Sequence, residues 1–171
     1  MAQAEIVNGF VFFWGAAPPQ GVFSNWYKHS FEHEGKQFNC SEQYMMYAKA
    51  IVFGDKETAV LIMKSKDPRE QKALGRQVKN FDAGKWMAVC QDVMVPALVS
   101  KFEQDPYALE VMMSTGDAII AEASPYDNIW GIGLSSDDPD AQIKGRWKGK
   151  NLLGVCLMKA RSIIIGNQRL P

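Results

Sequence analysis

Hydrophobic residues follow two different periods along this chain, and each period predicts a different kind of element. Residues 6–14 are mostly β-branched and aromatic, which is typical of a buried strand. Residues 31–38 alternate around Glu34 and Gly35, which predicts a small hairpin. A short apolar run over 118–123 predicts a further strand. We therefore expect the strands near the ends of the chain and helices between them.

Helix signals fill the middle of the chain. Asn39, followed three residues later by Glu42, resembles a capping box and predicts that a helix begins at Asn39. Asp precedes Pro at 67–68 and again at 105–106, and Pro suits the first position of a helix. Helices are also expected over residues 55–65, 82–104 and 151–165, the last one ending at Gly166. Pro96 should kink or split the helix that contains it.

These elements define an expected fold class. Residues 124–147 are rich in Gly, Asp and Pro and predict a long loop. Strands and helices do not alternate as a doubly wound sheet requires. The chain of 171 residues has the length of one domain and shows no internal repeat or linker-like segment. We predict an α+β fold, a single and predominantly helical domain over residues 1–171 with a small β-sheet.

Composition excludes several classes of protein. The chain has 19 basic and 19 acidic residues, so its net charge of zero argues against binding nucleic acid mainly through a strong positive field. No apolar run reaches the roughly 20 residues of a membrane span, and the N-terminus has no secretory pattern. Three separated cysteines and two histidines do not suggest a zinc site. We expect a cytoplasmic protein with free thiols, no metal and no cofactor.

Glu42 and Lys49 form the first candidate site. Their spacing, with Met45 between them, places a carboxylate and an amine two turns apart on one helical face. The positive end of the helix would favour the ionised form of Glu42. From spacing alone, the simpler interpretation is that Glu42 caps the helix and Lys49 faces water.

The long loop contains a second candidate site. Asp127 lies three residues before Trp130, which offers a carboxylate beside a surface for stacking. Gly131 and Gly133 would let the backbone approach a ligand closely. Long loops in compact domains are commonly functional, although an ordered surface loop anchored by Trp130 explains the same residues.

Tryptophan is frequent in this chain. Three of its five tryptophans follow polar residues, at 25–26, 85–86 and 146–147, which suits stacking on a ring near a cation. The basic run over 144–150 precedes a predicted helix and is either a phosphate contact or a solvated turn. No arrangement typical of a serine or cysteine nucleophile is present.

Together these segments resemble the NADAR family, also called the YbiA-like family. The similarity extends from about residue 12 to residue 161, and Gln43 stands where the family often has His. The matching segments, in the family's order, are Phe-Ser-Asn-Trp at 23–26, Ser-Glu-Gln-Tyr at 41–44 continuing to Lys49, Gly-Arg at 75–76, Lys-Trp at 85–86, Lys-Phe at 101–102, Asp-Asn-Ile-Trp-Gly at 127–131 and Gly-Lys-Asn-Leu-Leu-Gly at 149–154.

The resemblance implies hydrolysis of N-glycosidic bonds to ribose. One substrate class of the family is ADP-ribose on the amino group of guanine, in nucleic acid or nucleotides, as in members that oppose ADP-ribosyltransferase toxins. The other is the phosphorylated ribosylamino-pyrimidines of riboflavin synthesis. By the same resemblance, the catalytic candidates are Glu42, Lys49 and Asp127. The residues implied to bind substrate are Asn25, Ser41, Tyr44, Arg76, Trp86, Trp130 and Gly131.

Two chemical routes suit these residue types. Cleavage of the bond builds positive charge on the ribose, which Glu42 or Asp127 could stabilise while one of them activates water. Alternatively, the riboside opens to an iminium and neutral Lys49 captures it as a Schiff base. An ionised Glu42 would raise the pKa of Lys49 and oppose the second route.

We expect removal of ADP-ribose from guanine bases, with riboflavin intermediates as the alternative substrates. The rival interpretations are a non-catalytic module that binds ADP-ribose or a nucleotide and a purely structural or interaction protein. The expected partners are therefore an ADP-ribosylated guanine or a phosphorylated ribosylamine, and no membrane.

Overall fold

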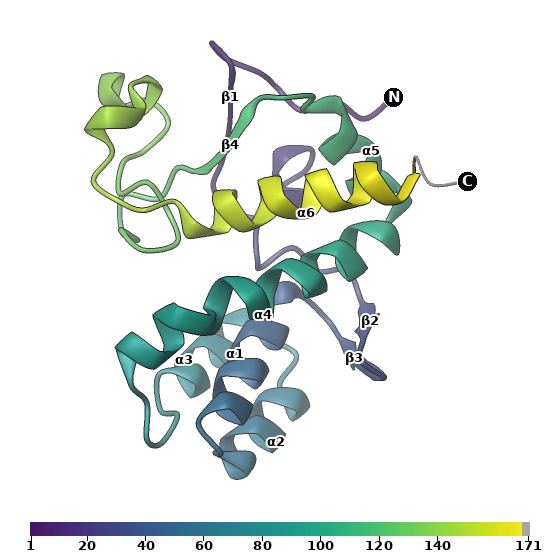
Figure 1. Cartoon of the computed structure of the whole chain (residues 1–171), viewed down its shortest axis with the longest axis vertical. Helices are drawn as coiled ribbons and strands as arrows, with labels where there is room; N and C mark the ends of the chain where they lie inside the picture. The colour runs from purple at the N-terminus through teal and green to yellow at the C-terminus, as the bar shows by residue number, and fades with distance from the viewer. Residues whose placement is uncertain (169–171) are drawn as a thin grey trace.

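A computed structural model describes residues 1–168 of the chain and contains six α-helices, four strands and three short 3-10 helices (Figure 1). Their bounds are β1 Phe10–Phe13, η1 Gln20–Phe23, β2 Phe31–His33, β3 Lys36–Phe38, α1 Ser41–Val52, α2 Lys56–Lys64, α3 Pro68–Gly75, α4 Ala83–Glu103, α5 Pro106–Ser114, β4 Ile119–Glu122, η2 Pro139–Gln142, η3 Lys144–Arg146 and α6 Leu152–Gln168. The prediction of a mostly helical α+β fold is confirmed.

The strands form two separate pairs. β2 and β3 make the predicted antiparallel hairpin, with Glu34 and Gly35 both at positive φ in its turn. β1 pairs with β4 in parallel, and Phe13 lies opposite Glu122 at the end of the register. Parallel strands end at the same edge of a sheet, so the residues that follow Phe13 and Glu122 come together there.

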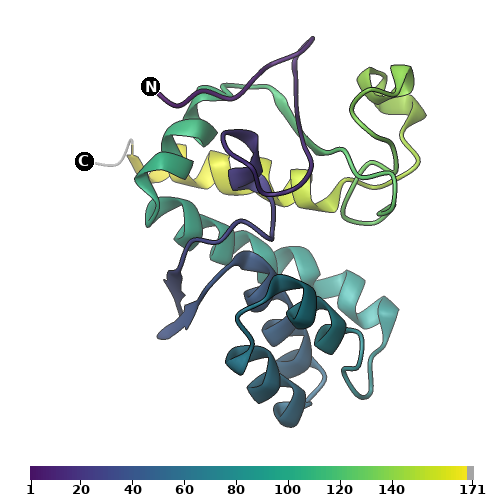
Figure 2. The same cartoon turned by 180° about the vertical axis from the view of Figure 1, so that it is seen from behind.

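The helices form two groups (Figures 1 and 2). Helices α1, α2 and α3 pack on one another, and α1 packs on α4. Helix α6 lies along α4 and also packs on β4. α1 and α3 approach closely because Gly75 has no side chain, and a Cβ there would lie 1.9 Å from the Met46 sulfur. This approach brings the two helices to one wall of the site described below.

Four of the predicted helix starts are confirmed by their capping bonds. The Asp55 carboxylate accepts from the Thr58 N–H, and the Asp82 carboxylate accepts from the Lys85 N–H. Asp67 and Asp105 cap the two helices that begin with Pro. An Asp side chain at this position satisfies backbone donors that have no partner within the helix, which explains why the sequence signal was reliable.

Three local predictions are wrong in detail. Asn39 is not the N-cap, because α1 begins at Ser41 after Cys40, and Asn39 N–H instead donates to the Gln43 side chain. Gly166 does not stop the last helix, which continues to Gln168. The first strand covers only four of the nine residues expected. Of the two effects expected at Pro96, a split is absent, because α4 runs through Pro96 as one helix.

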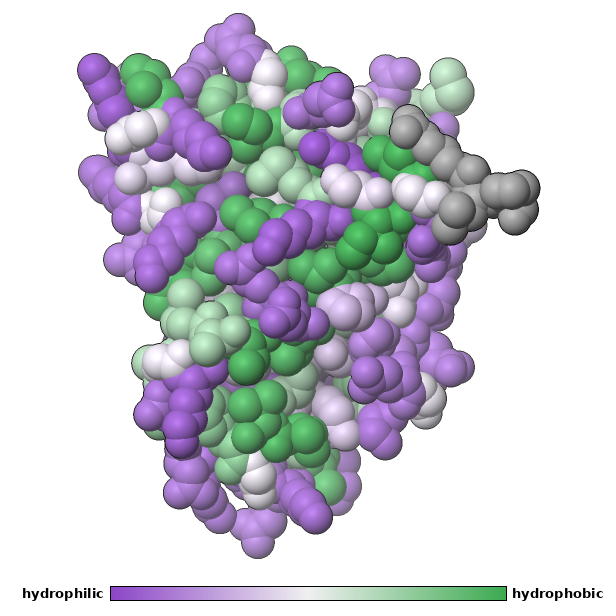
Figure 3. Space-filling model, viewed as in Figure 1, coloured by the Kyte–Doolittle hydropathy of each residue, from purple (hydrophilic) through white to green (hydrophobic). Residues whose placement is uncertain are grey.

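The core and the surface fit an ordinary folded domain. Cys40, Cys90 and Cys156 are free and buried, as expected for core thiols. Figure 3 shows hydrophilic and hydrophobic side chains mixed over one face, with hydrophobic ones gathered along the seam between α6 and α4. Among the described residues, no helix is both long enough and apolar enough to cross a membrane.

Candidate active site

A cavity of about 310 Å³ lies where the carboxyl edge of the β1–β4 pair faces helices α1, α3 and α4. Seven residues singled out from the sequence line it: Asn25, Glu42, Lys49, Arg76, Trp86, Asp127 and Trp130. They come from distant parts of the chain, so the fold brings together the two candidate sites that the sequence left separate. Trp26, Lys72, Phe81 and Glu122 also line the cavity.

Two carboxyl groups, each with a buried oxygen, face this cavity. Glu42 projects from the first turn of α1 and is 3% exposed, and burial raises its pKa to about 7. Glu122 ends β4, and burial together with the nearby Asp127 charge raises its pKa to about 7 as well. Glu42 therefore lines the cavity rather than only capping α1, and burial outweighs the effect of the helix terminus on its pKa.

Several polar atoms in the cavity wall have no partner within residues 1–168. They are Asn25 Oδ1, Glu42 Oε1 and Glu122 Oε2, all of them buried. A buried oxygen without a hydrogen bond costs about 1–3 kcal/mol, so such atoms are retained where a ligand or water meets them. Their convergence on one cavity indicates a binding site for a polar molecule.

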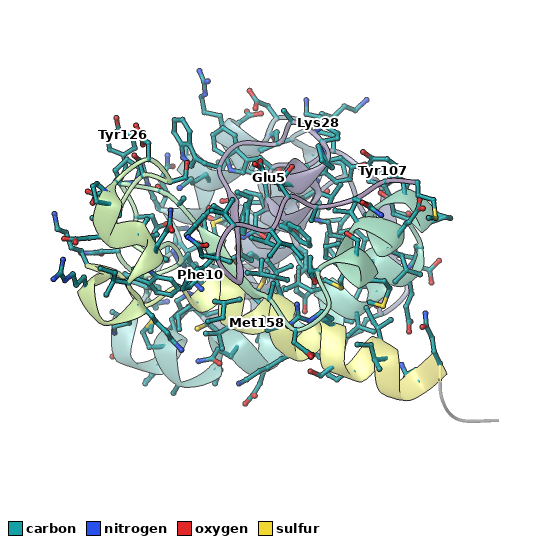
Figure 4. The ribbon with its side chains drawn as sticks, turned by 90° about the horizontal axis from the view of Figure 1, so that it is seen from above. Glu5, Phe10, Lys28, Tyr107, Tyr126 and Met158 are labelled. Carbon is teal, nitrogen blue, oxygen red and sulfur yellow. The ribbon has the colours of Figure 1, made fainter. Side chains whose placement is uncertain are left out.

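Asp127 organises the loop and also lines the cavity. Its Oδ1 accepts from the backbone N–H groups of Ile129 at 2.9 Å and Trp130 at 2.8 Å. These bonds fix the loop and leave the second carboxylate oxygen available. Tyr126, the preceding residue, is 86% exposed and projects outward from the loop (Figure 4).

Three cations also line the cavity. The Lys49 ammonium donates to the Gly75 carbonyl at 2.8 Å and lies 4.2 Å from the centre of the Phe81 ring. Burial lowers the pKa of Lys49, the Glu42 charge opposes this fall, and Arg76 adds to it. Lys72 and Arg76 are four residues apart at the end of α3, so they share one face of that helix.

Aromatic side chains close the sides of the cavity. Trp86 is buried at 6% exposure, while Trp26 and Trp130 are half-buried. Their indole faces suit a planar ring or a sugar face. Trp14 and Trp147 do not line the cavity, and the Trp147 indole instead donates to the Ala141 carbonyl.

Ser41, Tyr44 and Gly131, implied to bind substrate, do not line the cavity. The Ser41 hydroxyl accepts from the buried ammonium of Lys101 at 3.2 Å, and the Tyr44 hydroxyl donates to the Val93 carbonyl at 3.1 Å. A Cβ at Gly131 would lie 2.8 Å from the Asp127 carbonyl. All three contact other parts of the protein instead.

The basic run over 144–150 lies elsewhere. Arg146 pairs with Asp140 at 2.7 Å, and none of the run lines the cavity.

The charged residues of the cavity that the sequence analysis missed are Glu122 and Lys72. The available signal for Glu122 was a carboxylate directly at the end of an apolar strand. Gln43 has a structural role, because its amide donates to carbonyls at the end of α2.

Comparison with known proteins shows the family of this chain. The NADAR domain family model matches residues 12–165. The N-glycosidase R617 of Acanthamoeba polyphaga mimivirus is 38% identical over 160 residues, covering 89% of this chain and 94% of that protein. The N-glycosidase YbiA of Escherichia coli (strain K12) is 30% identical, with 93% and 88% covered.

A solved structure and a plant relative extend the comparison. The NMR structure of E. coli YbiA matches with a TM-score of 0.77 and 26% identity, covering 99% of this chain and 93% of that one. A chloroplastic riboflavin biosynthesis protein, PYRR from Zea mays, is 29% identical, covering 85% of this chain and 24% of the plant protein.

These relatives and the shared fold show an N-glycosidase, a hydrolase of N-glycosyl bonds. The chain belongs to the NADAR family.

Proposed function

We propose that this protein removes ADP-ribose from guanine bases by hydrolysing the bond between ribose C1 and the amino nitrogen. The observation that carries the proposal is the meeting of acidic and basic groups in one cavity. The carboxyl groups of Glu42, Glu122 and Asp127 and the cations of Lys49, Lys72 and Arg76 all line it.

The three carboxyl groups suit the reacting end of a riboside. Positive charge develops on the ribose C1 and ring oxygen as the bond to nitrogen breaks, and a nearby carboxylate stabilises it. Glu42 Oε1 is buried without a protein partner, so it is free to meet that charge or a water molecule.

The three cations suit a phosphate group. Lys72 and Arg76 present an ammonium and a guanidinium from the same helix face, and guanidinium groups bind phosphate through paired donors. A phosphate held there would place the ribose near the carboxyl groups of the same cavity.

An exposed aromatic pair supports the larger of the two substrate classes. Trp14 follows β1 and is 66% exposed, and its ring centre lies 6.4 Å from that of Tyr126. Both residues are adjacent in sequence to the edge from which Glu122 and Asp127 enter the cavity. A second nucleoside that extends out of the cavity could stack on these rings, worth about 1–3 kcal/mol per base.

The alternative substrates are phosphorylated ribosylamino-pyrimidines. The plant relative named as a riboflavin biosynthesis protein favours them. They need the same cations and carboxyl groups but no aromatic surface outside the cavity. Alanine substitution of Tyr126 separates the two classes: it should raise KM for an ADP-ribosylated guanine and leave KM for a ribosylamino-pyrimidine phosphate unchanged.

The direct test is incubation with a guanine-ADP-ribosylated oligonucleotide, with free ADP-ribose followed by mass spectrometry. Wild type should release ADP-ribose, and Glu42→Gln should lower the rate by about 100-fold or more while the fold is retained. Glu57→Gln, an exposed carboxyl outside the cavity, is the matched control and should keep the wild-type rate. Near wild-type turnover by Glu42→Gln would remove Glu42 from the mechanism.

Borohydride reduction decides between the two chemical routes. A Schiff base on Lys49 would be trapped as a stable adduct, and Lys49→Ala would lose both adduct and turnover. Turnover without any adduct on the wild-type protein favours attack by water. Release of neither substrate class, together with binding of ADP-ribose, would favour the non-catalytic module.

A further inference from the structure

Glu122 is held in place by its backbone more firmly than its position at a strand end requires. Its N–H donates to the Asn151 side chain at 3.1 Å, and its carbonyl accepts from the N–H groups of Ser124 and Ile132, both at 2.9 Å. Phe13 lies opposite it in the parallel pair. The backbone at the start of this side chain is therefore fixed, and Glu122 lines the cavity.

The carboxyl group itself is left unsatisfied. Glu122 Oε2 is buried and has no hydrogen-bond partner within residues 1–168, and the same holds for Glu42 Oε1 across the cavity. A glutamate kept for structure looks different in this protein: Glu70 Oε2 accepts from the Ser65 hydroxyl at 2.5 Å. The two unpaired oxygens in one cavity therefore point to a role toward a ligand.

Two negative charges in one buried cavity repel each other, so the pair retains a proton. The groups that face each carboxyl decide where that proton lies. Glu42 faces Lys72, the Trp26 indole and Lys49, which favour its charged form, and Asp127, which opposes it. Glu122 faces Asp127 and Glu42, which oppose its charge, with Lys72 as its only favourable neighbour of the three.

We propose that Glu122 is a catalytic acid, because the fixed end of β4 holds its unpaired carboxyl group in the same cavity as the carboxylate of Glu42. This inference rests on the proposed function as an N-glycosidase and assigns the leaving-group side of the reaction. Glu122 holds the proton and Glu42 is the ionised partner.

The bond between ribose C1 and the amino nitrogen breaks, and its electron pair goes to nitrogen. Glu122 gives its proton to that nitrogen, so the base leaves as a neutral amine and Glu122 becomes a carboxylate. Water attacks C1 and gives a proton to Glu42. Return of this proton to Glu122, directly or through solvent, restores the starting state.

A leaving-group experiment tests this assignment. The variants are Glu122→Gln and Glu42→Gln, with Glu57→Gln as the control outside the cavity. The two substrates are the ADP-ribosylated guanine and a nitrophenyl ribofuranoside 5-phosphate, whose leaving group needs no proton. Loss of a general acid costs about 100- to 10,000-fold when the leaving group needs protonation.

Glu122→Gln should lose that factor on the guanine substrate and retain a rate within about tenfold of wild type on the nitrophenyl substrate. Glu42→Gln should lose activity on both. Equal losses by Glu122→Gln on both substrates, or no loss on either, would overturn the role as acid. Glu122→Asp keeps the acid and should recover part of the rate, which separates chemistry from a folding defect.

A second measurement needs no turnover. The carboxyl carbons of the free protein are titrated by NMR in wild type and in Glu122→Gln. One proton should be retained by the pair well above the ordinary range of glutamate, and in Glu122→Gln the remaining Glu42 should titrate at lower pH. Two independent, ordinary titrations would reject the inference. If wild type hydrolyses neither substrate, the proposed function fails while the titration still decides whether the proton is shared.

Discussion

Burial acts in opposite directions on the acids of the cavity and on the lysine behind it. Glu42 and Glu122 hold their protons more tightly than free glutamate, and burial is the main cause for each. Lys101 is completely buried, and burial lowers its pKa to about 7. Its ammonium donates to the Ser24 carbonyl and the Ser41 hydroxyl, which flank Asn25 and Glu42 in sequence. Both kinds of group make the stability of the fold depend on pH.

The two glutamates should make the fold less stable as the pH rises from about 4.5 to 7. Their pKa values are about 7 in the folded protein and ordinary in the unfolded chain, so the folded state binds the extra protons. Their contribution is complete below pH 4.5 or so and is lost as the pH passes through 7. Urea unfolding should show a fall of about 1–3 kcal/mol in the free energy of unfolding over this range.

Glu42→Gln provides the check on this assignment, because it carries no charge to bury. Its free energy of unfolding should fall less over the same range and should exceed that of wild type at pH 8. Parallel pH curves for the variant and wild type would show that Glu42 titrates normally in the folded protein.

Lys101→Met should remove a pH dependence of the other sign. Because the pKa of Lys101 is lowered, its contribution is complete only above the pKa of free lysine and is lost as the pH falls toward 7. Wild type should therefore gain stability from this group between pH 7 and 10, and Lys101→Met should not. The variant also leaves two acceptors unpaired, which costs about 1–3 kcal/mol. Urea unfolding, with exposed Lys56→Met as the control, measures both effects.

At the scale of elements, the sequence predicted what is encoded locally. The Asp-Pro helix starts succeeded because the capping bond and the proline both act within one turn. The parallel pairing of β1 with β4 was not predicted, because it joins segments from opposite ends of the chain. Glu122 was missed for this reason: only the pairing reveals that the end of β4 faces Glu42.

At Asn39 and Gly166, a local signal predicted the wrong helix boundary. Asn39 had the side chain of an N-cap, but its amide is drawn away to the Lys66 carbonyl. Gly166 is a helix-stop residue by preference, yet α6 continues past it. In both cases tertiary contacts or an extended helix outweigh a preference of about 1 kcal/mol.

Asn151 joins the strand pair to the start of α6. It has a positive φ of 53°, and its amide bonds the Glu122 N–H and the Ile120 carbonyl. Asn151→Ala should therefore lower the free energy of unfolding by about 2–4 kcal/mol and also reduce turnover, since Glu122 loses an anchor. Asn80→Ala, an exposed residue at a similar φ of 57°, should cost 1 kcal/mol or so. Equal losses in the two variants would show that only backbone strain matters.

At the scale of the whole molecule, the cavity lies between two groups of elements. Helices α1 and α3 supply the cations and Glu42, while β4 and the loop after it supply Glu122 and Asp127 (Figures 1 and 2). A substrate that meets both walls ties these groups together. A bound ligand also stabilises the fold by mass action.

Binding of ADP-ribose should therefore protect both walls against hydrogen exchange. We expect slower exchange of amides in α1, in α3 and over residues 124–130, with little change in α2. Hydrogen exchange followed by mass spectrometry, with and without ADP-ribose, measures this pattern. Protection confined to one wall would show that the ligand does not span the cavity.

The lining of the cavity has an optical consequence. Three of the five tryptophans, Trp26, Trp86 and Trp130, surround the space that a ligand enters. Indole emission responds to loss of contact with water and to stacking against another ring, so intrinsic fluorescence should change as the cavity fills. The exposed Trp14 would contribute a background that Trp14→Phe removes. The protein thus carries its own reporter of occupancy, and binding and release can be timed without any label.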